Sequence, residues 1–130
     1  MLLLAAGCQK TGKLSPDLQT RFDKEGMLHR ADDVMFRRTR PAGYRDSGWD
    51  EKRASIIVTR ESVFIHVNSK PLVDVTPRST GFYEVRRDHE RISFHAGSGG
   101  SALIWSFRPP DDADSWTKDI RAVIKNAKSR

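Results

Sequence analysis

The chain has 130 residues, of which 37% are hydrophobic and 31% are charged, a balance that supports one modest hydrophobic core and excludes two. Its formal charge of +6 comes from arginine more than from lysine, and residues of both signs are mixed along the sequence. The presence of one cysteine excludes an intrachain disulfide, so the folded domain is held together by packing alone.

The chain opens with a short apolar run that ends in small residues and the cysteine, MLLLAAGC. Seven residues before a cysteine are too few to cross the ~30 Å hydrocarbon core of a bilayer, which needs about 20. The segment LAAGC (residues 4–8) resembles the lipobox of a bacterial lipoprotein signal peptide. The resemblance implies that residues 1–7 are a signal-peptide remnant, that Cys8 carries the lipid, and that residues 8–14 form a lipidated polar tether.

The lipoprotein resemblance also implies a location in the bacterial cell envelope. Gln9 follows the cysteine, where many enterobacterial lipoproteins that stay in the inner membrane have aspartate. This favours a lipid anchor in the outer membrane, facing the periplasm. No basic residue precedes the apolar run, so we expect a few basic and apolar residues upstream of Met1. The alternative interpretation of the same run is a free cysteine behind an ordinary apolar N-terminus.

Export decides how the positive charge is interpreted. A strongly basic domain is otherwise typical of nucleic-acid binding. Outside the cytoplasm that partner is excluded, and the remaining counter-charges are anionic lipid head groups, lipopolysaccharide or cell-wall polymer. Because acidic residues are interspersed, an ordinary solvated surface is the alternative.

A short helix is predicted between residues 15 and 26. Ser15 suits the N-cap, Pro16 suits the first helical position, and Gly26 suits the exit. Leu18 and Phe22 lie four residues apart and form one narrow apolar edge. We therefore expect this helix to pack lightly against a larger element.

Apolar residues then recur with a period of two, which is typical of strands. Turns are indicated at residues 88–90 and 97–100, and the charged segment 40–48 predicts a longer loop. Short loops between successive strands favour an antiparallel meander. We expect seven short strands, over residues 34–36, 54–59, 63–67, 72–75, 82–85, 92–96 and 102–107.

The strand pattern stops at residues 108–110, and a helical period follows. Asp111 or Asp112 can cap this helix. Its apolar stripe consists of Trp116, Ile120, Val123, Ile124 and Ala127. Trp116 lies on that stripe, so we expect it to be a plug in the hydrophobic core.

Seven strands closed by one amphipathic helix, with a tryptophan in its first turns, resemble the pleckstrin-homology superfold. The segments that carry the resemblance are ASIIVT (residues 54–59), VFIHV (63–67), ALIWSF (102–107) and WTKDI (116–120). The match covers residues 32–128. It implies a mainly β, seven-stranded antiparallel barrel or sandwich, capped by the C-terminal helix, within a single domain at residues 15–130. It also implies a binding module.

Members of that family that hold phosphoinositides use basic residues between the first two strands. Guanidinium groups fit phosphate oxygens geometrically. Phosphoinositides are not expected outside a bacterial cell, so only a looser contact with an anionic surface or a partner carries over. Asp46, Asp50 and Glu51 lie in the same stretch and dilute its positive field. The residues predicted to make this contact are Arg37, Arg38, Arg40, Arg45, Tyr44, Trp49, Lys52 and Arg53.

No residue pattern indicates catalysis, a cofactor or a metal site. The four histidines are scattered without the spacing of metal ligands. The aspartate pairs at 32–33 and 111–112 stand where a strand begins or a helix is capped. The glycine-rich segment 97–100 lacks the lysine and the following helix of a phosphate loop. We therefore expect no enzyme activity.

Two functions of different classes stay open. The first is a lipid-anchored binding or scaffolding module, whose sheet edge or open barrel end takes a protein or peptide, or whose basic surface meets an anionic lipid or lipopolysaccharide. The second is a small envelope lipoprotein that inhibits a protease or a cell-wall hydrolase. Its inhibitory loop would be residues 40–49, with Tyr44 and Trp49 as anchors.

Overall fold

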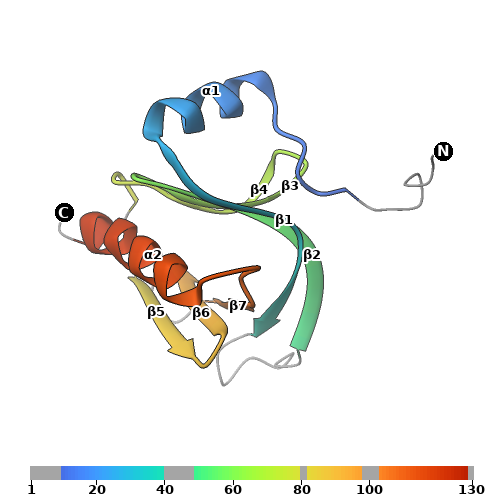
Figure 1. Cartoon of the computed structure of the whole chain (residues 1–130), viewed down its shortest axis with the longest axis vertical. Coiled ribbons are helices and arrows are strands. Elements are labelled where there is room, and N and C mark those ends of the chain that lie inside the picture. The colour runs from blue at the N-terminus through green and yellow to red at the C-terminus, as the bar shows by residue number, and fades with distance from the viewer. Residues whose placement is uncertain (1–9, 40–48, 80–81, 98–102, 129–130) are drawn as a thin grey trace.

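The computed structural model describes residues 10–39, 49–79, 82–97 and 103–128, which form one seven-stranded sheet and two helices (Figure 1). The strands pair in the order β4-β3-β2-β1-β7-β6-β5, and all the pairings are antiparallel. This confirms the predicted fold class: mainly β, with seven antiparallel strands, a C-terminal helix and a short N-terminal helix. The elements are α1 (Pro16–Glu25), β1 (Met27–Thr39), β2 (Trp49–Thr59), β3 (Val63–Val67), β4 (Lys70–Val75), β5 (Phe82–Asp88), β6 (Arg91–Gly97), β7 (Leu103–Phe107) and α2 (Ala113–Lys128).

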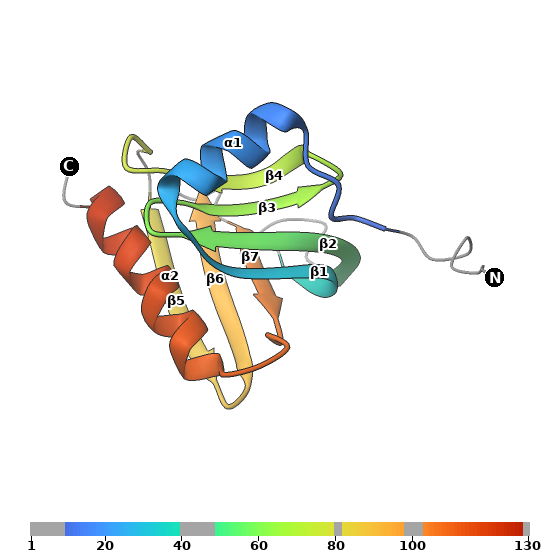
Figure 2. The ribbon, with the colours of Figure 1, turned by 45° about the horizontal axis from the view of Figure 1, so that its top comes forward.

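The sheet curls into a half-barrel, with α2 on its concave side and α1 on its convex side (Figures 1 and 2). β1 joins the two halves of the sheet, because it pairs with β2 along most of its length and with β7 through Arg37, Arg38 and Thr39. A register shift lies between Ala31 and Val34, where Asp33 has a φ of 56°. This β-bulge interrupts the alternation of side chains between the two faces of β1.

The main hydrophobic core fills the concave side. α2 buries its apolar stripe there, and Trp116 at 1% exposure is its largest member. The indole ring lies 5.8 Å from the ring of Phe107 and 4.5 Å from the ring of His29, both measured between centroids. Because these two residues belong to β7 and β1, Trp116 contacts both halves of the curled sheet. The prediction that it plugs the core is confirmed.

A second, smaller core lies on the convex side under α1. Phe22 is the buried residue of that helix, and its ring centroid lies 5.1 Å from that of Phe64 in β3. Ile57 of β2 completes this cluster. Residues 54–59 of β2 are thus buried on both faces, which explains the continuous apolar run there. The narrow apolar edge predicted for the helix is confirmed, as are the Ser15 cap and the Gly26 exit.

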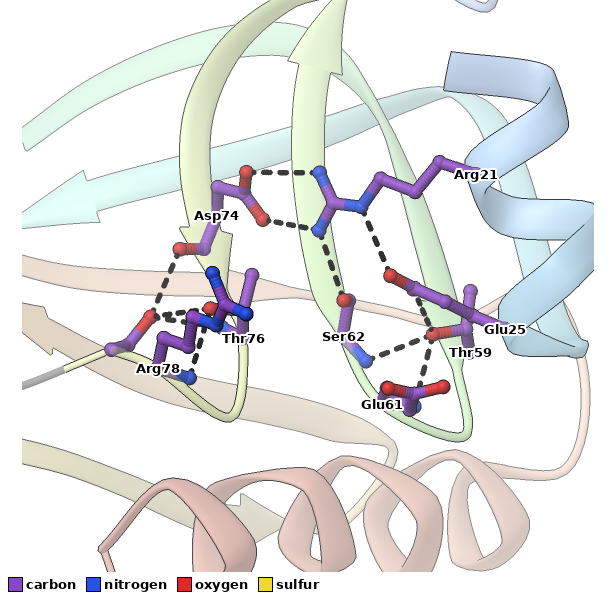
Figure 3. A network of polar contacts seen from close by, with 9 residues as sticks. Arg21, Glu25, Thr59, Glu61, Ser62, Asp74, Thr76 and Arg78 are labelled. Atoms are coloured by element: carbon purple, nitrogen blue, oxygen red, sulfur yellow. Dashed lines mark hydrogen bonds and ion pairs between the residues drawn. The ribbon is translucent and has the colours of Figure 1, made fainter. Parts of the chain in front are cut away.

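A polar network fastens α1 to the edge of the sheet (Figure 3). The guanidinium of Arg21 donates two hydrogen bonds to Asp74, at 2.9 and 3.1 Å, and one to Ser62 at 3.0 Å. It also pairs with Glu25 at 3.0 Å. Its hydrogen bonds to Asp74, followed by those to Glu25, raise the pKa of Arg21 above its usual value in spite of partial burial. The helix is therefore held by a bidentate ion pair as well as by Phe22.

The first two strands are longer than the sequence pattern indicates. Residues 34–36 and 54–59 were the predicted strands, whereas β1 and β2 pair from Met27↔Thr59 to Thr39↔Trp49. The added residues are mostly polar, so no alternation marks them. Backbone hydrogen bonds across the hairpin hold them in the sheet.

Replacing Trp116 tests how α2 closes the half-barrel. Trp116→Ala is expected to lower the free energy of unfolding by about 3–5 kcal/mol, because it empties a buried aromatic site. Urea denaturation measures this loss. Trp116→Phe is the matched control: it keeps most of the apolar contact, loses the 2.8 Å hydrogen bond from the indole nitrogen to Asp111, and should cost less. An alanine variant within about 1 kcal/mol of wild type would show that α2 does not close the sheet.

Candidate functional site

The residues predicted to contact an anionic surface or a partner separate into described and undescribed groups. Cys8, Arg40, Tyr44 and Arg45 lie outside the described residues, and so does the loop of the inhibitor hypothesis up to residue 48. Trp49 is described only as the first residue of β2. The side chains that the structure places are those of Arg37, Arg38, Lys52 and Arg53.

These four side chains do not share one surface. Successive residues of a strand point to opposite faces, and Arg38 lies on the core side, its guanidinium carbon 5.8 Å from the ring centre of Trp105. Lys52 pairs in register with the buried Phe36 and belongs to the same side. Arg37 and Arg53 lie on the convex side. The predicted stretch is therefore divided between the rim of the core and the convex face.

On the convex face, Arg37 meets two arginines that the sequence did not single out. Arg91 is the first residue of β6, and Arg108 directly follows β7. Ile92 of β6 pairs with Phe107 of β7. The residues one position beyond this pair, Arg91 and Arg108, are therefore also opposite each other. A shallow pocket of about 400 Å³ opens between these strands. Its lining residues are Val34, Met35, Arg37, Glu51, Arg91 and Arg108.

The electrostatics of this pocket are dominated by the arginines. Burial, followed by the charges of Arg37 and Arg108, lowers the pKa of Arg91, and Glu51 opposes this shift. Arg91 donates a 3.3 Å hydrogen bond to the hydroxyl of Ser106, which is 5% exposed. Three guanidinium groups face one carboxylate, so the lining carries a formal charge of +2. An arginine stays charged at neutral pH, and the pocket is therefore a concentrated positive site.

The acidic neighbours neutralise this charge only weakly. The nearest approach of Arg37 to Glu51 is 3.4 Å, and both side chains are about half exposed, at 50% and 54%. Arg108 approaches Glu90 at 3.8 Å, with exposures of 68% and 75%. Exposed ion pairs of this kind contribute about 0–1 kcal/mol. The guanidinium groups keep most of their capacity to bind another anion.

The described part of the predicted tether is docked on the same convex face. We call residues 10–14 the N-terminal strap. Thr11, 4% exposed, donates from its hydroxyl to Asp33 at 2.9 Å and shares a 2.6 Å hydrogen bond with the hydroxyl of Ser55. Its carbonyl accepts from the backbone of Asn68 at 2.8 Å. A Cβ on Gly12 would clash with the carboxylate of Asp32, so a larger residue there would require this exposed side chain to move.

Arg53 connects the strap to the arginine pocket. It donates a 2.8 Å hydrogen bond to the carbonyl of Asp33, the residue that holds Thr11. It also pairs in register with Met35, which lines the pocket. The strap and the pocket are therefore neighbours on one surface. We call this surface the basic face, defined by Arg37, Arg53, Arg91 and Arg108.

A buried histidine lies beside the docked strap. His66 is fully buried, is the cross-strand partner of Ser55, and accepts a 3.0 Å hydrogen bond at Nδ1 from the backbone of Ser69. Within the described residues, its Nε2 is the buried side-chain nitrogen or oxygen without a hydrogen-bond partner. Burial lowers the pKa of His66, and the charge of Asp32 opposes the shift. The neutral imidazole, with its proton on Nε2, is the form that fits this site.

This lowered pKa predicts a pH-dependent stability. Below about pH 6.5 the unfolded chain binds a proton at His66 that the folded chain resists. The free energy of unfolding should therefore fall as the pH drops below that value, and urea denaturation at pH 7 and pH 5 measures the fall. His66→Asn keeps an acceptor near Nδ1 and removes the titration, so its fall should be smaller.

His89→Asn is the control for this measurement, because the His89 side chain is 94% exposed. This variant should lose as much stability as wild type between the two pH values. An equal loss in His66→Asn would contradict the assignment.

Other candidate sites are weaker. Among residues 10–39, 49–79, 82–97 and 103–128, no group of three or more histidine, cysteine, aspartate or glutamate side chains is arranged to hold a metal ion. In that same part of the chain, no helix has the length and apolar character needed to cross a membrane. A second surface hollow beside the start of α2 is lined by arginines and acids together and lacks a dominant charge.

No family model matches the chain, and none of the curated proteins is significantly similar to it in sequence. The basic face and the strap are therefore the features from which a function can be inferred.

Proposed function

We propose that this protein is a lipid-anchored binding module of the bacterial cell envelope, whose pleckstrin-homology-like domain holds its basic face against an anionic membrane surface. The observation that carries the proposal is the placement of the strap and the arginine pocket on the same convex face. The order of the strands and the helix that plugs the concave side support the resemblance to the pleckstrin-homology superfold.

The short distance between Cys8 and the docked strap gives the domain an orientation. Thr11 is three positions after Cys8, and an extended chain spans at most ~3.3–3.6 Å per residue. A lipid on Cys8 would thus hold Thr11 within roughly 10 Å of the membrane surface. This is close to the Debye length of about 8–10 Å, within which an anionic surface attracts basic groups. A second attachment of this kind makes a lipid anchor more stable.

Binding of a partner by strand addition is less well supported. The edge strand β4 begins Lys70-Pro71, and a charge and a proline both block pairing with a further strand. The other edge strand, β5, is contacted by α2. At the outer-membrane location proposed from Gln9, the basic face would meet the phospholipid head groups of the leaflet that faces the periplasm.

Vesicle co-sedimentation tests this function. The substitution Cys8→Ser in the full chain removes the proposed lipid, so that any membrane binding depends on the basic face alone. It should sediment with anionic vesicles and not with neutral ones, and binding should fade as salt rises from about 0.01 to about 1 M, where the Debye length falls from about 30 to about 3 Å. The added double change Arg37→Gln/Arg91→Gln should weaken partition by roughly 30-fold, at about 1 kcal/mol per charge.

Arg121→Gln is the matched control, since Arg121 is an exposed arginine of α2, away from the convex side. This variant should sediment as well as the Cys8→Ser chain. Equal and poor sedimentation with neutral and anionic vesicles at low salt would refute the proposal.

A further inference from the structure

The geometry points to the pocket between Arg37, Arg91 and Arg108 as a discrete site for one dianionic phosphate group, the kind carried by a phosphomonoester. This phosphate site deepens the proposed function. It depends on that function only if the phosphate belongs to a membrane lipid. The site lies on the convex face of β1, β6 and the residue after β7. It shares Arg37 with the basic contact that the family resemblance implied, whereas Arg91 and Arg108 lie outside that stretch.

The three guanidinium groups are positioned by the sheet itself. Arg37 pairs in register with Ser106 of β7, and Ser106 accepts the hydrogen bond that orients Arg91. Arg108 follows β7 directly, opposite Arg91. Backbone pairing of three neighbouring strands thus fixes where the donors start, and no loop has to close around the ligand. A guanidinium donates two parallel hydrogen bonds to phosphate oxygens.

The charge of the pocket selects the ligand class. Three arginines and Glu51 give a formal charge of +2 among the lining residues. A phosphomonoester carries about −1.5 to −2 at neutral pH. A phosphodiester carries a single negative charge and would leave the arginines repelling one another. Burial is the main cause of the lowered pKa of Arg91, and the charges of Arg37 and Arg108 add to it, so this repulsion accounts for part of the shift.

One apolar side chain beside the arginines, that of Met35, suits the remainder of a lipid head group. Met35 lines the pocket and is 41% exposed, one of two large hydrophobic residues so exposed among the described ones. Val34 also lines the pocket, but its side chain packs against the concave core. A phosphate held by the guanidinium groups would place its ester carbon against Met35.

Titration of the Cys8→Ser chain with two small probes tests the site. Methyl phosphate is a monoester and dimethyl phosphate is a diester, and both are added at constant ionic strength. The side-chain Nε–Hε signals of Arg37, Arg91 and Arg108 should shift saturably with methyl phosphate and at least about tenfold more weakly with dimethyl phosphate. Equal shifts with both probes, or no saturable shift, would overturn the inference.

Single substitutions locate the binding. Arg91→Gln and Arg37→Gln should each weaken methyl phosphate binding at least about tenfold, whereas Arg121→Gln should leave it unchanged. Two site variants are used because Arg91 also bonds Ser106, and the amide spectrum of each shows whether the fold is kept. Full binding in both site variants would overturn the assignment of the pocket.

Vesicles of matched surface charge separate the sources of the phosphate. Phosphatidic acid presents a monoester and phosphatidylglycerol a diester. Preference for phosphatidic acid, reversed by methyl phosphate, identifies a lipid head group. Methyl phosphate binding with no vesicle binding supports the site, assigns it to a soluble phosphomonoester, and refutes the membrane function. Vesicle binding with no methyl phosphate binding overturns the site alone.

Discussion

Burial of residues 54–59 of β2 on both faces is the constraint on which the rest of the structure depends. Ala54, Ile56 and Val58 belong to the concave core, Ile57 lies under α1, and Ser55 lies under the strap. Covering the second face of this strand requires the N-terminal residues to run along the convex side. In the described part of the chain, the convex surface of β1, β6 and β7 is left without a covering helix, and the arginine pocket opens there.

Docking of the strap on the convex side also restricts how the domain can rotate relative to Cys8. Thr11 is a polar residue buried by polar partners, and its hydrogen bonds to Asp33 and Ser55 replace the water that it loses. A freely flexible tether would let an anchored domain rotate against the membrane. If Cys8 carries a lipid, a strap docked within a few residues of it would present one face to the membrane. Arg53 lies on that face, between the strap and the pocket.

Local patterns predicted the elements well and the site only in part. Caps at Ser15 and Gly26 and the stripe that includes Trp116 are encoded within single elements, so the sequence indicates them. The early start of β1 is hidden by the bulge at Asp33, which breaks the alternation. Arg91 lies opposite Arg108 because of the register of β6 and β7. The only sign of this register in the sequence is that the two arginines are nearly equally far from the turn predicted at residues 97–100. Docking of the strap depends on contacts between distant residues, which no local pattern records.

Orientation of the lipid-modified protein on a membrane tests the central claim most directly. The measurement is the broadening of backbone amide signals by spin-labelled head groups, with the lipidated chain bound to nanodiscs. We expect strong broadening at Thr11, Arg37 and Arg91 and little in α2, which lies on the concave side of the sheet, away from the basic face (Figure 1). Equal broadening across the chain, or stronger broadening in α2 than at the arginines, would contradict it.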